Sequence, residues 1–560
     1  MHFFARFYIL LTTQICLAAC SVSPRFPPLL DATLEELRQG LDSGLFTSTD
    51  LVTAYVARIN EVQAELHVVN ELNPDALFIA SERDAERLRD DQSWSRYWPW
   101  RKQRGSLHGI PVLVKDNIGT YDKMNTTAGS YALVGARVKE DSTVVAKLRQ
   151  AGAIILGKTS LAEWAACRSK NSTSSWSAYG GQTYGAYFPG QDPSGSSSGS
   201  AVGTSLGLTW ASLGTETMGS IMHPSHLGNL VGIKPTLGLT SRYMVIPISE
   251  HRDAVGPMAR TVKDAAHLLS AIAGRDPHDN YTSAIPFDKL PDYVSACRGP
   301  SFIKGKRLGV SRDLMKLTPD TTADIAPEVF EEALDTLREA GAIIVDNIAF
   351  PQIEPYQVRE WFSSLLGSDF MTDLPRYFAA LEVNPYNITS IQELMDFTHK
   401  HPLENYPEHD TITWENIIKS GRGNESPEFW GNYSQIPKRF GHSSILGALK
   451  NYTLDAMILP APHVYPAAAV LGIPAITVPM GRTPVDSPVV ENSFGGMNET
   501  APNQPMGLGF TGPEFSEELL IGLAHGFEQL TMFRKRVKPY IWPATELGDV
   551  VAGRLVWTDL

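Results

Sequence analysis

A run of glycines and hydroxyl side chains supplies the residues of this chain that are best suited to chemistry. Residues 194–200 read Ser-Gly-Ser-Ser-Ser-Gly-Ser, and residues 214–220 read Gly-Thr-Glu-Thr-Met-Gly-Ser. Glycine permits tight turns and the close approach of backbone N–H groups to a ligand. Ser220, at the end of such a turn, can therefore be a nucleophile surrounded by amide donors. A flexible Ser/Gly linker is the alternative, but apolar segments typical of a core, 201–210 and 230–235, flank the motif.

Lys115 is the candidate base. It follows the apolar run Ile110-Pro-Val-Leu-Val114, which predicts a buried strand with the lysine at its carboxyl end. Functional groups in open α/β sheets gather at that edge. Burial and neighbouring dipoles can lower the pKa of a lysine to roughly 7–8, which makes the neutral amine available as a base. A solvated surface lysine is the alternative interpretation.

Several ordered blocks of the sequence resemble the amidase signature family. Besides the two serine motifs, the matching blocks are 109–117, 126–130, 156–163, 231–236 and 471–480. The resemblance covers roughly residues 30–540 and is weakest between about 280 and 450. Residues 176–183 and the variant Gly-Thr-Glu-Thr resemble most closely the subgroup that contains peptide amidase.

The resemblance implies an amide hydrolase with a Ser-Ser-Lys triad and no cofactor. It assigns Ser220 as nucleophile, Lys115 as base, and Ser196, at a cis peptide bond, as the hydroxyl that relays a proton between them. It places the oxyanion hole in the backbone N–H groups of Thr217, Met218, Gly219 and Ser220. No Cys/His cluster has the spacing of metal ligands, so we expect no metal. The implied partner is a small-molecule or peptide amide.

The chain departs from the family pattern around Ser220. Glu216 replaces the usual Asp, Met222 stands where Arg is common, and Met218 replaces Gly or Asp. A catalytically impaired binding protein is therefore an alternative function, and an amidotransferase-type member is another. His223 would suit a Ser-His mechanism, but we expect a packing or capping histidine. We expect Met218 to have a negative φ and to shape the acyl side of the pocket.

The elements around these residues predict a parallel α/β unit. Thr47 and Asp50 form a capping box before a helix over 47–65, and Ser142 caps a helix that ends before a strand over 153–156. Further helices are predicted over 256–274 and 517–529. The resemblance implies an α/β fold with one large catalytic domain, residues 29–560, in which a mixed β-sheet is sandwiched between helical layers.

The segment 280–450 is less regular and aromatic. It either covers a substrate entrance or packs at the periphery, and its aromatic residues include Trp361, Phe362, Tyr377, Trp414 and Trp430.

The formal charge of −13 argues against nucleic acid as a partner, because phosphate binding needs a basic face. The apolar run 7–19 is too short for a confident membrane span. It predicts a signal peptide over 1–20, an N-terminal extension over 21–28, and a secreted protein without stable membrane insertion. Leu17-Ala-Ala-Cys20 resembles a lipobox, so a lipid anchor on Cys20 is the alternative.

Eight Asn-x-Ser/Thr triplets favour a glycosylated secreted protein. They begin at Asn125, Asn171, Asn280, Asn387, Asn424, Asn432, Asn451 and Asn498, of which the Asn424 triplet is weakened by Pro427. Cys167 and Cys297 would remain after signal cleavage and could form one disulfide. The oligomeric state is left open.

Overall fold

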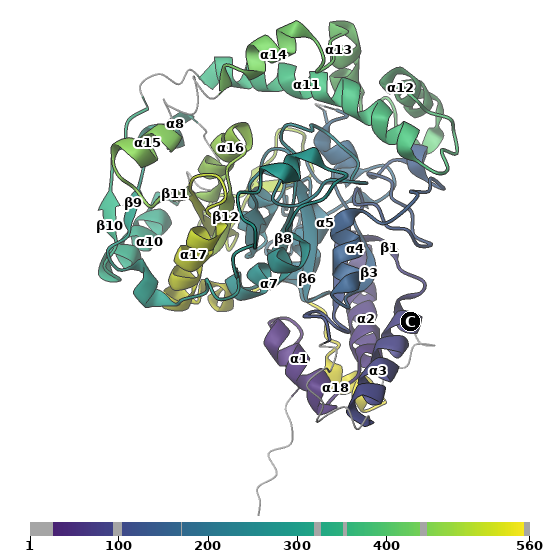
Figure 1. Cartoon of the computed structure of the whole chain (residues 1–560), viewed down its shortest axis with the longest axis vertical. Coiled ribbons are helices and arrows are strands. Elements are labelled where there is room, and N and C mark those ends of the chain that lie inside the picture. Colours follow the sequence, from purple (N-terminus) through teal and green to yellow (C-terminus); the bar gives the residue numbers. More distant parts are fainter. Residues whose placement is uncertain are drawn as a thin grey trace, which may run out of the picture.

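A mixed sheet of eleven strands lies at the centre of the molecule (Figure 1). The computed structural model describes residues 26–92, 104–169, 171–317, 326–350, 355–436 and 445–553. The predicted signal peptide, Cys20 and the side chains of Trp361 and Phe362 lie outside the described residues. In sheet order the strands are β1 (Val69–Leu72), β3 (Ile154–Thr159), β2 (Pro111–Lys115), β6 (Ala211–Glu216), β8 (Ala254–Ala259), β7 (Val231–Lys234), β12 (Ala475–Arg482), β15 (Pro505–Thr511), β11 (Ala456–Pro460), β9 (Arg307–Gly309) and β10 (Ile343–Val345).

Strand β2 is the element that gathers the candidate site. It pairs in parallel with both β3 and β6, whereas β6 pairs antiparallel with β8. Every residue of β2 and β6 is buried, as expected for strands covered on both faces. Because β2 and β6 run in the same direction, Lys115 and the end of β6 reach the same edge of the sheet.

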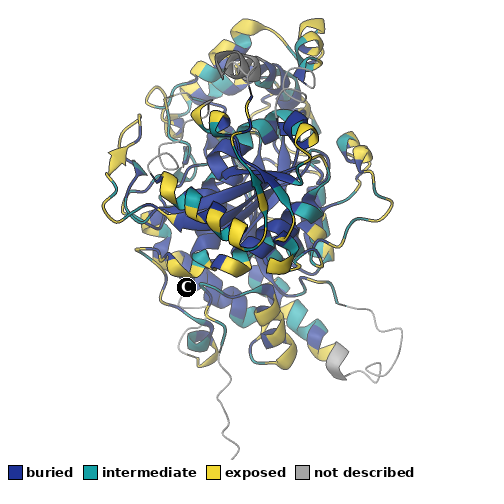
Figure 2. Cartoon of the chain, turned by 90° about the vertical axis from the view of Figure 1, so that its left-hand side faces the viewer, coloured by how far each residue is buried: buried dark blue, intermediate teal, exposed yellow. Residues whose placement is uncertain are grey.

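Helices enclose this sheet, so that the strands are buried between helices with exposed outer surfaces (Figure 2). One group, α4, α7, α10 and α17, packs together and on the sheet, and α5, α6 and α16 form a second group. The helices are α1 (Leu34–Ser43), α2 (Ser48–Leu66), α3 (Ala76–Gln92), α4 (Thr143–Gln150), α5 (Ser198–Ser205), α6 (Met222–Leu227), α7 (Val262–Ile272), α8 (Arg312–Leu317), α10 (Pro327–Glu339), α11 (Pro355–Ala380), α12 (Ile391–Lys400), α13 (Ile412–Ser420), α14 (Pro427–Tyr433), α15 (Ile445–Asn451), α16 (Ala461–Leu471), α17 (Glu517–Thr531) and α18 (Leu547–Val551). The α/β fold with a mixed sheet between helical layers is confirmed.

Most predicted elements near the site are confirmed, with two corrections. Helix α2 begins directly after Thr47, which forms the predicted capping box with Asp50 of the first turn. Ser142 precedes α4, but its hydroxyl makes no capping bond. The helix predicted over 256–274 is wrong in its first part, because β8 occupies Ala254–Ala259 and only α7 is helical. A continuous apolar run does not distinguish a fully buried strand from a buried helix.

Helices α11 to α14 form a separate layer above the sheet, at the top of Figure 1. Their inner residues join a core cluster that includes Phe378 and Trp414 and extends to Trp164 of the body. Trp164 meets the other two rings edge to face, at centroid distances of 6.4 Å for Phe378 and 6.1 Å for Trp414. The buried Arg168 guanidinium also bridges Glu163 of the body and Glu404 of this layer. Aromatic packing and a buried ion pair therefore attach the layer to the body.

The two cysteines among the described residues are free thiols, with Cys167 buried and Cys297 half-buried, so the disulfide considered above does not form. Within the described ranges, none of the helices combines the length and apolar character needed to cross a bilayer.

Candidate active site

Lys115 is fully buried at the carboxyl end of β2. Its Nζ donates to Ser196 Oγ at 2.7 Å, to Thr215 Oγ1 at 2.9 Å and to the Thr215 carbonyl at 3.3 Å. Burial lowers the pKa of Lys115 to about 7, although the nearby carboxylates of Asp253 and Glu216 oppose the shift. The structure therefore brings the two predicted residues Lys115 and Ser196 into contact, with the amine largely desolvated.

Ser196 lies on a loop that closely approaches its neighbours. The Gly195–Ser196 peptide bond is cis, as the family resemblance implied. A Cβ atom at Gly195 would lie 1.7 Å from the Ser174 carbonyl oxygen, so this position requires glycine. The Ser196 carbonyl accepts from Ala162 N, and the Ser197 hydroxyl donates to the Thr215 carbonyl at 3.1 Å. These bonds hold the Ser196 hydroxyl against Lys115.

Ser220 ends the turn that connects β6 to α6. Gly219 has a φ of +81°, and a Cβ there would meet the Tyr465 ring at 2.8 Å, so both backbone and space demand glycine. Met218 is not among the described residues with positive φ, which confirms the expected negative value. Among the described residues, no acceptor pairs with the backbone N–H of Met218, Gly219 or Ser220. Three amide donors thus remain available beside the Ser220 hydroxyl.

Two carboxylates hold this turn. Glu216 Oε2 accepts from the backbone N–H of Ile221 at 2.8 Å and of Met222 at 2.9 Å, at the start of α6. On the other side, Thr217 Oγ1 donates to Asp253 Oδ1 at 2.5 Å. The Glu216 contacts explain how the loop is supported although Met222 replaces the usual arginine. Sequence reasoning missed Asp253, because the strand that follows it was assigned to a helix.

His223 lies in the first turn of α6 and lines the same cavity as Ser220. Its backbone N–H donates to the Gly219 carbonyl at 2.8 Å, and its ring stacks on Tyr465 at a centroid distance of 5.8 Å. The stacking on Tyr465 is consistent with the packing role expected for His223.

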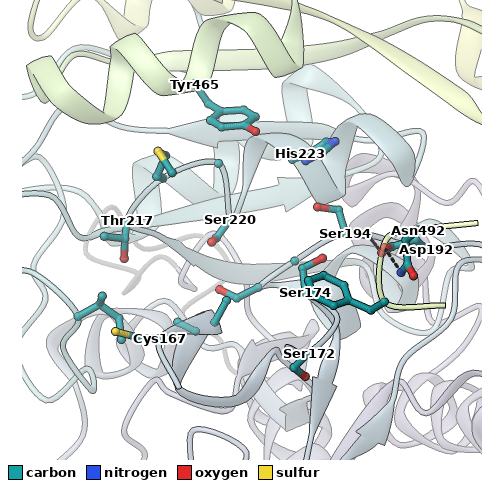
Figure 3. A pocket seen from close by; sticks show the side chains of 18 of the residues that line it. Cys167, Ser172, Ser174, Asp192, Ser194, Thr217, Ser220, His223, Tyr465 and Asn492 are labelled. Atoms are coloured by element: carbon teal, nitrogen blue, oxygen red, sulfur yellow. Dashed lines mark hydrogen bonds between the residues drawn. The ribbon is translucent and has the colours of Figure 1, made fainter. Parts of the chain in front are cut away.

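A cavity of about 460 Å³ opens over Ser196 and Ser220. In Figure 3, Cys167 and Thr217 lie to one side of Ser220, whereas Asp192, Ser194 and Asn492 lie to the other. The helical layer contributes Leu366 and Thr413, which sequence periodicity did not single out. All three predicted triad residues and the predicted oxyanion residues thus meet at this cavity or directly beneath it.

The sequence profile of the Amidase family matches residues 50–430. A protein of Arthroderma benhamiae named as an amidase is 46% identical over 556 residues, covering 95% of this chain and 90% of that one. This chain belongs to the amidase signature family. Native peptide amidase from Stenotrophomonas maltophilia is 36% identical, with a TM-score of 0.78 over 93% of this chain and 100% of its own. Peptide amidase in complex with the competitive inhibitor chymostatin gives a TM-score of 0.79 at 36% identity, over 91% and 99%. The protein is accordingly a hydrolase that acts on amides.

Proposed function

We propose that this amidase hydrolyses a carboxamide through Lys115, Ser196 and Ser220 and a covalent acyl-enzyme. The observation that carries the proposal is the 2.7 Å contact between Lys115 Nζ and Ser196 Oγ at the cavity that Ser220 lines. A hydroxyl can donate and accept at once, so Ser196 suits a proton relay. The similarity to peptide amidase supports a linear carboxamide, including the terminal amide of a peptide, as substrate.

In the proposed reaction, neutral Lys115 takes a proton from Ser196, which takes one from Ser220. The Ser220 oxygen attacks the carbonyl carbon, and the negative charge that develops on the carbonyl oxygen is stabilised by the N–H groups of residues 217–220. The C–N bond then breaks as the proton returns through Ser196 to the leaving nitrogen. Water activated by the same relay cleaves the ester and releases the acid.

The decisive test is Ser220→Ala. We expect kcat on an amide substrate to fall by roughly 10³–10⁶, and labelling by a fluorophosphonate probe to disappear. Ser493→Ala is the matched control, because Ser493 lines the same cavity and should leave labelling unchanged. Labelling that persists in Ser220→Ala would overturn the assignment. An inactive wild type that gains turnover through Met218→Gly would instead support the impaired binding protein.

We also propose that the protein is secreted and glycosylated, which rests on the apolar segment 7–19 and on the sequons. Four sequon asparagines are exposed and three are half-exposed, which suits modification. Asn424 is buried, and its Nδ2 donates to Glu250 at 2.9 Å and to Asp369 at 3.0 Å, so it should remain unmodified.

Mass analysis of protein from its native source should show a chain that begins near Ser21 and loses mass after glycosidase treatment. The peptide that contains Asn424 serves as the internal control and should carry no glycan. A lipid on Cys20 would favour the anchored form, and a full-length unmodified chain would contradict secretion.

A further inference from the structure

Lys115 Nζ has three oxygen atoms within hydrogen-bonding distance, and two of them belong to Thr215. The three are Ser196 Oγ at 2.7 Å, Thr215 Oγ1 at 2.9 Å and the Thr215 carbonyl at 3.3 Å. The ammonium form of lysine has three N–H donors and can serve all three atoms. The neutral amine, which the proposed reaction needs, has two N–H groups and one lone pair. Lys115 can act as a base toward Ser196 only if that lone pair faces the Ser196 hydroxyl.

The Thr215 carbonyl takes one of the two N–H groups, because a carbonyl oxygen only accepts. It also accepts from the Ser197 hydroxyl at 3.1 Å, so both of its lone pairs are engaged. The sheet fixes its position, since Thr215 lies in β6 and pairs with Val255 of β8. The second N–H group is therefore shared out between two hydroxyls, those of Ser196 and Thr215, and the other hydroxyl donates to the lone pair.

Asn117 acts on the Thr215 hydroxyl. Its Nδ2 donates to Thr215 Oγ1 at 3.0 Å, and both side chains are buried. When Lys115 is an ammonium group, the two lone pairs of Oγ1 accept from Lys115 and Asn117, so the hydroxyl proton points away from both. Loss of the lysine proton that faces Ser196 preserves this arrangement. Loss of the one that faces Thr215 would require the Thr215 hydroxyl to rotate.

The amide of Asn117 is itself incompletely paired. Among the described residues, its Oδ1 is buried without a hydrogen-bond partner. An unpaired buried oxygen costs stability, so packing alone does not account for an amide at this position. The contact of Nδ2 with Thr215, one residue away from the lysine base, gives the amide a reason to be there.

We propose that Thr215 is a positioning residue for the lysine base: its two oxygens accept both N–H groups of neutral Lys115, which directs the lone pair at the Ser196 hydroxyl. Asn117 supports this role by donating to the Thr215 hydroxyl. The inference rests on the proposed function, since it concerns the base of the same triad. Thr215 exchanges no atom in the reaction. The proton passes from Ser220 to Ser196 and from Ser196 to the Nζ lone pair, while the hydrogen bonds to Thr215 stay in place.

Thr215→Val tests this inference, because valine has the shape of threonine, suits a strand and lacks the hydroxyl. We expect kcat at high pH to fall by about 10–100-fold, the scale of one hydrogen bond to a charged group. KM should change little, because Thr215 does not line the cavity. Thr215→Ser keeps the hydroxyl and should restore most of the activity. If the Thr215 hydroxyl instead donates to the lone pair, Thr215→Val frees the amine and kcat does not fall, which would overturn the inference.

The pH profile separates positioning from a general loss of structure. An ammonium group gains more from an acceptor than a neutral amine does, so loss of Thr215 Oγ1 lowers the pKa of Lys115 further. The rise of kcat/KM with pH should therefore move below its wild-type position near 7, although the plateau is lower. Asp253 and Glu216, the carboxylates that favour protonated Lys115, are retained in the variant. A lower plateau with an unchanged rise would show a structural role only and would overturn the inference.

Two further variants locate the effect. Thr511→Val is the matched control, since Thr511 is a buried strand residue whose Oγ1 donates to the Pro474 carbonyl at 2.8 Å. It should leave kcat and the pH profile unchanged. Asn117→Ala should lower kcat by about 2–10-fold, the scale of one neutral hydrogen bond. In the Thr215→Val background it should have no further effect, because its partner is gone. Additive losses, or an equal effect of Thr511→Val, would overturn the inference.

The outcome is separable from that of the proposed function. Ser220→Ala tests the nucleophile, whereas Thr215→Val tests the support of the base. If the wild type hydrolyses no amide, the proposed function fails. The contact is then read from the NMR titration of the Lys115 side chain in protein labelled with ¹³C-lysine, assigned by the signal that Lys115→Met removes. Titration at a lower pH in Thr215→Val than in the wild type supports the inference, and equal midpoints would overturn it.

Discussion

The two sides of the cavity are built by different physical means. At the sheet edge, buried polar groups are joined by short hydrogen bonds, as between Lys115 and Ser196 or Glu216 and the start of α6. The layer of α11 to α14 is held mainly by aromatic packing around Trp414, together with the buried ion pair of Arg168 and Glu404. Among its described residues, Leu366 and Thr413 line the cavity. Hydrogen bonds between buried groups restrict the movement of the side chains that they join. The reacting groups are therefore positioned by strands. The residues with which the layer of α11 to α14 lines the cavity can change without disturbing these groups.

Between these two regions, the largest effect on kcat is expected at Lys115 of the sheet edge. Lys115→Ala should lower kcat by about 10²–10⁴, the range for loss of a general base. In the wild type, burial lowers the pKa of Lys115 to about 7, so the neutral amine is depleted below this pH. The kcat/KM profile should therefore rise with pH through about 7.

His223→Ala is the control for this rise of kcat/KM with pH. It should leave the rise near pH 7 intact, because the His223 ring stacks on Tyr465 and the proposed base is Lys115. A profile in which His223→Ala removes the rise and Lys115→Ala keeps it would replace the lysine by a histidine base.

Substitutions in the layer of α11 to α14 should lower stability more than activity. Trp414 is fully buried against Trp164, so Trp414→Ala should lower the free energy of unfolding by about 3–5 kcal/mol. Turnover per folded molecule should change little. Trp430→Ala, at a position that is 50% exposed in the same layer, should cost far less in a denaturant titration. Equal losses for the two tryptophans would show that burial is not what attaches the layer.

Glu216 tests how far the support of the Ser220 turn contributes to activity. Glu216→Ala removes two charged hydrogen bonds to α6, each worth about 1.5–3 kcal/mol, and should lower kcat by about 10–100-fold with little change in KM. Glu216→Gln retains one acceptor oxygen and should restore most of the loss. If the two variants lose activity equally, the charge of Glu216 matters more than its support of the turn.

The effect that is most restricted to one class of substrate is expected at Met218, which is 42% exposed and lines the cavity. Met218→Asp should reduce kcat/KM for apolar acyl amides by about 1–3 kcal/mol, the scale of a hydrophobic pocket contact. Polar acyl amides measured in parallel should lose less. Equal losses would mean that Met218 supports the loop and does not contact the acyl group.

The site residues at the sheet edge could be predicted from the sequence, whereas those in the layer of α11 to α14 could not, for a physical reason. Lys115 follows a short apolar strand and Ser220 ends a glycine turn, and both patterns are local. The contacts of Glu216 and Asp253 depend on how the turn folds back, so no spacing indicates them. Leu366 and Thr413 come from a layer whose place over the cavity is set by tertiary packing.

The polar contacts of the site join distant parts of the chain, which has a consequence for its synthesis. Lys115 and Ser196 are 81 residues apart, and Asp192 and Asn492 are 300 residues apart. Such non-local pairings form late, because loop closure must come before the contacts that reward it. A nascent chain that has not yet produced Asn492 lacks both the contact to Asp192 and the interior strand β15, which follows it in the sequence. We therefore expect the emerging polypeptide to be inert until β15 has been synthesised and paired with its neighbouring strands.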